Sequence, residues 1–396
     1  MLTLDKVFNA QTILKGIVRE TKPVRAYGIA PDCELYLKPE NLQITGSFKV
    51  RGSAYKIAML SEEEKKKGVI ACSAGNHAQG VALAATKNGI KSLICLPDTA
   101  PISKVEATKG YGAEVCLVEG CYDDAYRKAL ELRDSEGYTF VHPFDDENVI
   151  AGQGTIALEI LTDLDNIDAI VVPIGGGGLI SGIAYTVKQI RPSIKVYGVQ
   201  VAGAPSMYNS VKDGEIECLP SVSTIADGIA VKKPGENTYA LVKEYVDEIA
   251  LVTDDEVSSA ILALIEKQKM IAEGAGATAV AAVMFDKFNL KGKRVVAVVS
   301  GGNIDVTSLS RVIDRGLLQS GRSSSLLIEL IDKPGQLKEI SRIIADCGGN
   351  VTGVHYENGN TESVNGCFLR IEMETRDFDH VNLITKSLRC EGFKLV

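Results

Sequence analysis

Between residues 68 and 303, short apolar runs alternate with longer segments of helical periodicity. The runs GVIACS (68–73), KSLICLP (91–97), DAIVVPIGGGG (168–178) and KRVVAVVSGGN (293–303) carry charge only at their first one or two positions. Strands with uninterrupted apolar runs are typical of parallel sheets that helices cover on both faces. The pattern therefore predicts an α/β protein with enough units for two such sheets.

A different pattern follows the segment LLQSGRSSS (317–325), which is rich in small and polar residues and is a candidate linker. The residues after it predict strand, helix, strand, strand, helix and a short final strand. This is the βαββαβ order of ferredoxin-like units. We therefore expect residues 1–320 to form one domain of two subdomains, residues 321–324 a linker, and residues 325–396 a second domain.

The composition limits the class of protein. The 396 residues are 45% hydrophobic and 24% charged, as in ordinary globular proteins, and the net charge of −8 argues against nucleic acid or an anionic membrane as partner. The nine cysteines contain no Cys-x-x-Cys pair and the four histidines are far apart, so we expect free thiols, a cytoplasmic location and no metal site. The longest apolar run, residues 277–285, is too short to span a bilayer.

The stretch ENLQITGSFKVRG (40–52) contains a lysine in unusual company. Lys49 follows Phe48 and stands between small residues. It is either an ordinary surface charge or an amine that attacks an aldehyde, for which apolar surroundings favour the required neutral form. The stretch alone does not decide between the two.

Four consecutive glycines in PIGGGGLISG (173–182) follow an apolar strand and precede a predicted helix. Without side chains, the backbone can direct successive N–H groups at one anion, and the start of the helix adds partial positive charge. The dinucleotide pattern Gly-x-Gly-x-x-Gly fails, because Ile180 is the sixth residue counted from Gly175. A single phosphate is therefore the better ligand.

A second strand-to-helix turn, CSAGNHAQG (72–80), offers backbone N–H groups and short polar side chains at Ser73, Gly75, Asn76 and His77. A helix start of this kind suits a carboxylate, although a simple cluster of helix caps is an alternative.

The stretch VVSGGN (298–303) places Ser300 at the end of a very apolar strand, where open α/β sheets bind ligands. The alternative is that Ser300 only caps the next helix.

Taken together, the four stretches supply an aldehyde-trapping amine, a phosphate site, a carboxylate site and a hydroxyl for a ring atom. A cofactor with an aldehyde, a phosphate and a ring nitrogen is pyridoxal phosphate, and its carboxylate-bearing partner is an amino acid.

In order and context, TGSFKVRG, SAGNHAQG, PIGGGGLISG and SGGN resemble the motifs of fold-type II pyridoxal-phosphate enzymes, and most closely those of threonine dehydratases (threonine ammonia-lyases). The resemblance covers about residues 1–320, and the remainder is similar to an ACT domain, a small amino-acid-sensing module. It implies two parallel-sheet subdomains of the tryptophan synthase β type. It also implies β-elimination and deamination of L-threonine to 2-oxobutanoate and ammonia, with L-serine as a secondary substrate giving pyruvate.

The resemblance also assigns residues to roles. Lys49 would carry the cofactor as a Schiff base and, once freed, remove the α-proton, before the β-hydroxyl leaves with a proton from the cofactor phosphate. Phe48 would pack near the ring, Asn76 would hydrogen-bond the phenolic oxygen, and Ser300 would meet the pyridine nitrogen. As a neutral hydroxyl, Ser300 favours prompt loss of the β-hydroxyl over transamination. The phosphate would be bound by Gly175, Gly176, Gly177, Gly178 and Leu179, and the substrate carboxylate by Ser73, Ala74, Gly75, Asn76 and His77.

Two rival functions need consideration. Serine racemases have similar motifs, but they need a second acid/base where this chain has Ala74 and an acidic metal ligand where it has Ala204. A catalytically inactive amino-acid sensor would not require an intact Lys49, glycine loop and Ser300. Both comparisons favour the lyase.

The ACT-like unit implies allosteric regulation and pairing into a homodimer or homotetramer. We expect an amino-acid effector near Asp332, Gly335 and Asn350, of an identity that the sequence does not specify. Asp227 in IADG and Glu273 in AEGAGA either approach the active site or form structural hydrogen bonds.

Overall fold

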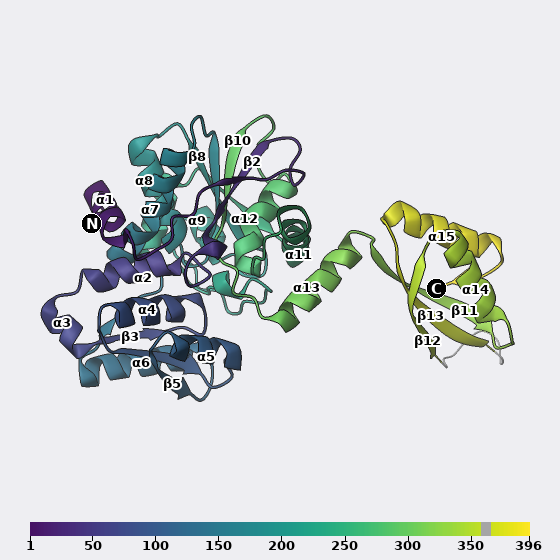
Figure 1. Ribbon diagram of the computed structural model, residues 1–396, viewed down its shortest axis with the longest axis horizontal. Coiled ribbons are helices and arrows are strands. Elements are labelled where there is room, and N and C mark those ends of the chain that lie inside the picture. Colours follow the sequence, from purple (N-terminus) through teal and green to yellow (C-terminus); the bar gives the residue numbers. More distant parts are fainter. Residues whose placement is uncertain (358–365) are drawn as a thin grey trace. The chain divides into compact units, whose positions relative to one another are not determined.

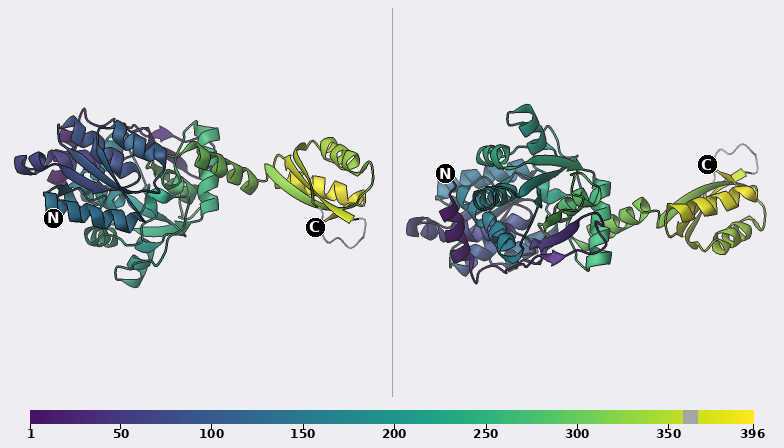
Figure 2. Two further views of the ribbon diagram at one scale, coloured as in Figure 1. Left: turned by 90° about the horizontal axis from the view of Figure 1, so that it is seen from below. Right: turned by 90° about the horizontal axis from the view of Figure 1, so that it is seen from above.

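The computed structural model describes residues 1–357 and 366–396, and it divides into two compact units, Met1–Leu309 and Ser310–Val396. The larger unit contains two sheets with helices on their faces, and the smaller contains one antiparallel sheet (Figures 1 and 2). The α/β class and the two parallel sheets predicted from the sequence are confirmed.

The larger sheet has the strand order β1-β2-β10-β7-β8-β9, and only β1 runs antiparallel to its neighbour. Val296 and Val298 pack toward the two long helices that lie side by side in Figure 1, α7 and α8, while α12 contacts the sheet as well. The strands are β1 (Val24–Arg25), β2 (Glu34–Pro39), β10 (Arg294–Val299), β7 (Ala169–Pro173), β8 (Lys195–Val201) and β9 (Glu248–Val252), and the helices are α7 (Glu147–Asp163), α8 (Gly178–Ile190) and α12 (Gly274–Met284).

The smaller parallel sheet has the order β5-β4-β3-β6. Alternate residues of β3 face opposite sides, so Val69 and Ala71 join the core beneath α4, and Ile70 and Cys72 join the core with α6. The elements are β5 (Glu114–Val118), β4 (Ser92–Pro97), β3 (Val69–Cys72), β6 (Thr139–Phe140), α4 (Asn76–Lys87) and α6 (Tyr122–Glu136).

Helix α2 contacts both subdomains, since it packs against α4 on one side and α7 on the other. The other elements of this unit are α1 (Leu4–Leu14), α2 (Lys49–Ala58), α3 (Glu62–Lys67), α5 (Ile102–Gly110), α9 (Ser206–Asp213), α10 (Glu236–Tyr245) and α11 (Asp254–Ala263), with the short helices η1 (Glu40–Leu42), η2 (Asp227–Ile229) and the π-helix η3 (Leu264–Gln268). Because β7 and β10 are adjacent and parallel, the glycine loop and Ser300 leave the same sheet edge next to each other.

The smaller unit has the predicted βαββαβ order, with an antiparallel sheet in the order β12-β13-β11-β14 and helices α14 and α15 packed on its apolar core. Helix α13 spans the division between the units, and β11 begins at Ser323, inside the predicted linker. The exact domain boundary stays a prediction. The elements are α13 (Val306–Gln319), β11 (Ser323–Ile331), α14 (Gln336–Asp346), β12 (Asn350–Glu357), β13 (Gly366–Glu374), α15 (Phe378–Cys390) and β14 (Lys394–Leu395).

Candidate active site

Lys49 is the first residue of α2, and its side chain is largely enclosed. Its Nζ donates a hydrogen bond to the carbonyl oxygen of Pro143 at 2.9 Å and lies 5.3 Å from the centre of the Phe48 ring. Burial lowers the pKa of the amine to about 8, although the nearby charge of Glu273 opposes this shift. These surroundings suit a nucleophilic amine better than a solvated surface charge.

The segment before Lys49 runs beside the end of β10. The backbone N–H of Phe48 donates to the carbonyl of Ser300 at 3.1 Å, and that of Gly302 donates to the carbonyl of Gly46 at 2.9 Å. The Ser300 hydroxyl is buried and lies 3.3 Å from the carbonyl oxygen of Ala275, to which it donates. The structure therefore brings Lys49, Phe48 and Ser300 together, as the sequence predicted for one site.

The glycine loop forms the start of α8, which begins at Gly178 after Gly177 with a φ of +98°. Among the described residues, the backbone N–H groups from Gly175 to Leu179 donate no hydrogen bond, although most of this loop is buried. Buried N–H groups are rarely left unpaired, so the loop has the donors that a phosphate requires. A methyl group on Gly176 would lie 2.5 Å from ring carbons of Phe144, which explains why glycine is needed there.

The start of α4 forms the second predicted anion site. The Ser73 hydroxyl accepts a hydrogen bond from the N–H of Gly75 at 3.1 Å and so closes the turn. The N–H groups of Ala74, Asn76 and His77 have no acceptor within the part of the chain that the structure describes. Open space lies beside Gly75. These free donors fit a pyridoxal-phosphate site with room for a substrate carboxylate.

The side chain of His77 points away from this turn into the protein interior. Its Nε2 lies 2.8 Å from the carbonyl oxygen of Val141, so it must donate, and its Nδ1 lies 3.5 Å from the Ser53 hydroxyl. Burial and the charge of Lys49 lower the pKa of His77 to about 3. The His77 side chain is therefore engaged in the interior, and a contact of its backbone N–H with a substrate carboxylate stays a prediction.

The amide of Asn76 is engaged at both ends. Its Nδ2 donates to Glu273 at 2.7 Å, and its Oδ1 accepts from Asn303 at 2.7 Å. The Nδ2 group of Asn76 carries a second hydrogen that is still available, so the hydrogen bond of Asn76 to a cofactor oxygen stays a prediction that these two contacts do not oppose.

Glu273 is the acidic group at the centre of the site, and the sequence left its position open. Burial and the charge of Asp227 raise its pKa to about 7, against the hydrogen bond from Asn76. Asp227 itself is mostly exposed and pairs with Lys104 at 2.6 Å. Glu273 therefore exchanges a proton near neutral pH, next to the candidate amine.

We expect Glu273→Gln to change how stability depends on pH. Between its ordinary pKa of 4.5 and the raised value of about 7, Glu273 keeps a proton in the folded protein that the unfolded chain releases. Rising pH across this window therefore destabilises the wild-type fold, by on the order of 3 kcal/mol in total, and the glutamine variant lacks this loss. Urea unfolding of both cofactor-free proteins across this pH range would measure it, and identical pH profiles would contradict it.

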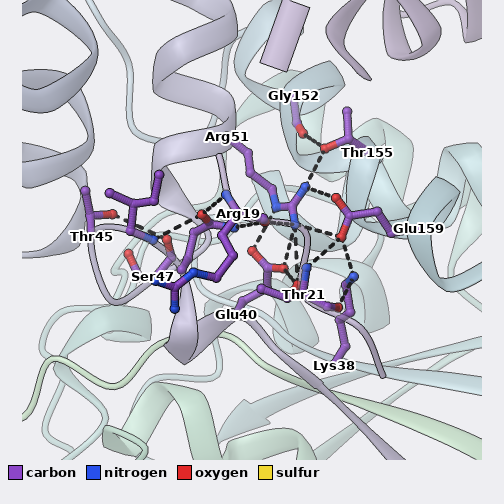
Figure 3. A network of polar contacts seen from close by, with 12 residues as sticks. Arg19, Thr21, Lys38, Glu40, Thr45, Ser47, Arg51, Gly152, Thr155 and Glu159 are labelled. Atoms are coloured by element: carbon purple, nitrogen blue, oxygen red, sulfur yellow. Dashed lines mark hydrogen bonds and ion pairs between the residues drawn. The ribbon is translucent and has the colours of Figure 1, made fainter. Parts of the chain in front are cut away.

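Arg51, two residues after Lys49, anchors α2 through a buried ionic network (Figure 3). Its guanidinium donates two hydrogen bonds to Glu40 at 2.8 Å and contacts Glu159 at 2.6 and 2.9 Å. Lys38 pairs with Glu159, and Thr21 with Glu40. Although burial opposes charge, the two carboxylates hold the pKa of Arg51 above its usual range. The network fixes the first turn of the helix that carries Lys49.

The loop of residues 141–146, between β6 and α7, also belongs to the candidate site and was not predicted from the sequence. Pro143 accepts the hydrogen bond from Lys49, Phe144 packs on the glycine loop, and Asp145 accepts from two N–H groups of α10. The pattern FDDE before a helix is a sign of a helix cap, which Asp146 indeed provides for α7. Contacts made by a main-chain carbonyl leave no such sign.

The predicted effector residues lie in the smaller unit. Asp332 and Gly335 are exposed in the turn before α14, where Gly335 has a φ of +96°. Asn350 begins β12 and donates to Glu374 at 2.8 Å. Space beside Gly335 is open.

These features define a pyridoxal-phosphate enzyme, and the sequence pattern of the "Pyridoxal-phosphate dependent enzyme" family matches residues 14–301. The chain belongs to this family. The L-threonine ammonia-lyase of Thermotoga maritima is 48% identical over 398 residues, which cover 100% of this chain and 99% of the relative. The relative's length therefore includes a counterpart of the smaller unit.

Solved structures agree with this assignment. Threonine deaminase isoform 2 of Solanum lycopersicum has a TM-score of 0.76 at 38% identity, covering 80% of this chain and 90% of the other. Maize serine racemase has a TM-score of 0.75 at 34% identity, covering 80% and 98%. Outside residues 358–365, no helix is long and apolar enough to cross a membrane, and no cluster of three or more acidic, histidine or cysteine side chains is suited to a metal ion.

Proposed function

We propose that this protein is a threonine ammonia-lyase that converts L-threonine to 2-oxobutanoate and ammonia, with L-serine as a secondary substrate. The observation that carries the proposal is its 48% identity, over the full length of both chains, to a protein named L-threonine ammonia-lyase. The arrangement of Lys49 beside two free anion sites supports it chemically.

Bound pyridoxal phosphate would withdraw electrons from the α-carbon of the substrate and so acidify its proton. Lys49 is the residue placed to move that proton, since a base with a pKa of about 8 is partly neutral near physiological pH. The N–H groups at the start of α4 would hold the substrate carboxylate. Loss of the β-hydroxyl and hydrolysis of the released product then give the keto acid and ammonia.

Serine racemase is the rival function, because maize serine racemase has a similar fold. Racemisation needs a second proton-transferring group opposite Lys49. Ala74, at the predicted position of that group, has no ionisable side chain. This difference favours elimination.

Keto-acid release from L-threonine and L-serine tests the function directly, with chiral analysis of the recovered serine in the same reactions. We expect 2-oxobutanoate from threonine as the faster product and no accumulation of D-serine. Racemised serine without keto acid would support the rival, and neither product would support an inactive sensor.

We also propose that the smaller unit is an ACT domain that binds an amino-acid effector near Asp332, Gly335 and Asn350. Its βαββαβ order and the open turn before α14 support this role. Residues 1–320 would then be the catalytic domain and residues 325–396 the regulatory one. We propose further that the protein forms a homodimer or homotetramer. A cytoplasmic location is also proposed, because nine free thiols are consistent with a reducing compartment.

We expect Asp332→Ala to weaken the response to an effector without changing activity in its absence, because Asp332 is exposed and remote in sequence from the catalytic motifs. Rates of keto-acid release are measured with each branched-chain amino acid in turn. Asp379→Ala, an exposed acid on α15, is the matched control. If a wild-type response survives unchanged in Asp332→Ala, the effector site lies elsewhere.

A further inference from the structure

A buried threonine supports the glycine loop from behind. Thr238 is fully buried in the first turn of α10, and its hydroxyl lies 2.6 Å from the carbonyl oxygen of Gly176. The same hydroxyl lies 3.2 Å from the carbonyl oxygen of Gly235, just before α10, and so is farther from it. Thr238 also packs closely on the next residue, since a methyl group on Gly177 would lie 2.8 Å from its Cβ.

This hydrogen bond fixes the direction of one peptide group. In a trans peptide the C=O of Gly176 and the N–H of Gly177 point in opposite directions. When Thr238 holds the carbonyl on its own side, the N–H must point away from Thr238. A peptide between two glycines is otherwise free to turn over, because neither residue has a Cβ to restrict it.

Thr238 is itself held in place by Asp145. The two carboxylate oxygens of Asp145 accept hydrogen bonds from the N–H groups of Glu236 and Thr238, each at 3.1 Å. The approach is close, since a methyl group on Gly235 would lie 2.2 Å from the Asp145 carboxyl carbon. Asp145 thus caps the first turn of α10 and directs the Thr238 hydroxyl at the glycine loop.

We propose that Thr238, held by Asp145, is a positioning residue that aims the N–H of Gly177 at the cofactor phosphate. Neither residue belongs to the segment assigned to the phosphate, Gly175 to Leu179. The inference rests on the assignment of Gly175 to Leu179 as the phosphate site.

The test compares two ligands that differ only in the phosphate, pyridoxal phosphate and pyridoxal, each titrated into full-length protein freed of cofactor. Thr238→Val keeps the shape but removes the hydroxyl, whereas Thr238→Ser keeps the hydroxyl. We expect Thr238→Val to weaken the binding of pyridoxal phosphate roughly tenfold or more, which is the effect of one lost buried hydrogen bond. The binding of pyridoxal should stay unchanged. Thr238→Ser should bind both ligands like the wild type.

The phosphorus NMR shift of the bound cofactor is a second readout, and it should move in Thr238→Val but not in Thr238→Ser. If Thr238→Val does not fold, Asp145→Asn serves instead, because its amide accepts only one of the two N–H groups. An equal loss for both ligands, or unchanged affinity for pyridoxal phosphate, would overturn the role of Thr238. A wild-type protein that binds both ligands equally would instead overturn the phosphate site itself.

Discussion

Replacing Lys49 with alanine is expected to reduce keto-acid release from L-threonine by at least about a thousandfold, because it removes both the covalent attachment and the proton-transferring amine. The variant should also lose the visible absorption of the attached cofactor. We expect the truncation of this side chain, which forms no ion pair in the described residues, to leave the fold intact, so that the loss is chemical. Turnover and the absorption spectrum are measured on the same preparation.

Lys66→Ala is the matched control, since Lys66 is an exposed lysine on α3. It should retain wild-type turnover and colour. Normal turnover in Lys49→Ala would contradict the assignment of Lys49, whatever its spectrum.

Arg51→Met should have the largest effect on stability. It leaves the carboxylates of Glu40 and Glu159 buried with only Lys38 as a cationic partner. Removal of one partner from a buried ion network costs about 3–5 kcal/mol, because the remaining charge stays desolvated. The urea midpoint of the larger unit, followed by release of the cofactor, measures this change.

An exposed ion pair in the same unit provides the contrast. Arg127 pairs with Asp124 on the surface of α6. Arg127→Met should cost about 1 kcal/mol or less, since solvent screens the pair. Equal midpoints for the two variants would show that the Arg51 network contributes no more than a surface contact.

The fold could be predicted because its buried strands have a recognisable sequence pattern. Strands such as β7 and β10 are buried on both faces and therefore appear as unbroken apolar runs, and the small C-terminal unit follows one simple order. The boundary between the two domains was harder to predict from the sequence. Helix α13 runs to Gln319 and β11 begins at Ser323, so the connection is shorter than the segment of small and polar residues suggested.

The site was predictable where chemistry needs particular residues. Lys49 and the four glycines could be proposed from the sequence because an amine and side-chain-free N–H donors have few substitutes, and their roles stay predictions. The inward direction of the His77 side chain could not be predicted, because its partner is the carbonyl oxygen of Val141, which is far away in sequence. The same applies to Pro143 and to the hydrogen bond between Asn76 and Glu273, which only the folded chain brings together.

The contact between Gly301 and Glu273 has a consequence for how this site can change by mutation. The Glu273 carboxylate oxygen would lie 2.2 Å from a methyl group on Gly301, so the two positions share one space. Exchange of Gly301 for alanine is expected to displace the Glu273 carboxylate and disturb its hydrogen bond with Asn76, and to be less harmful once residue 273 is shortened. The cost of changing Gly301 therefore depends on the residue at position 273, so the order in which the two substitutions arise decides whether the first is tolerated.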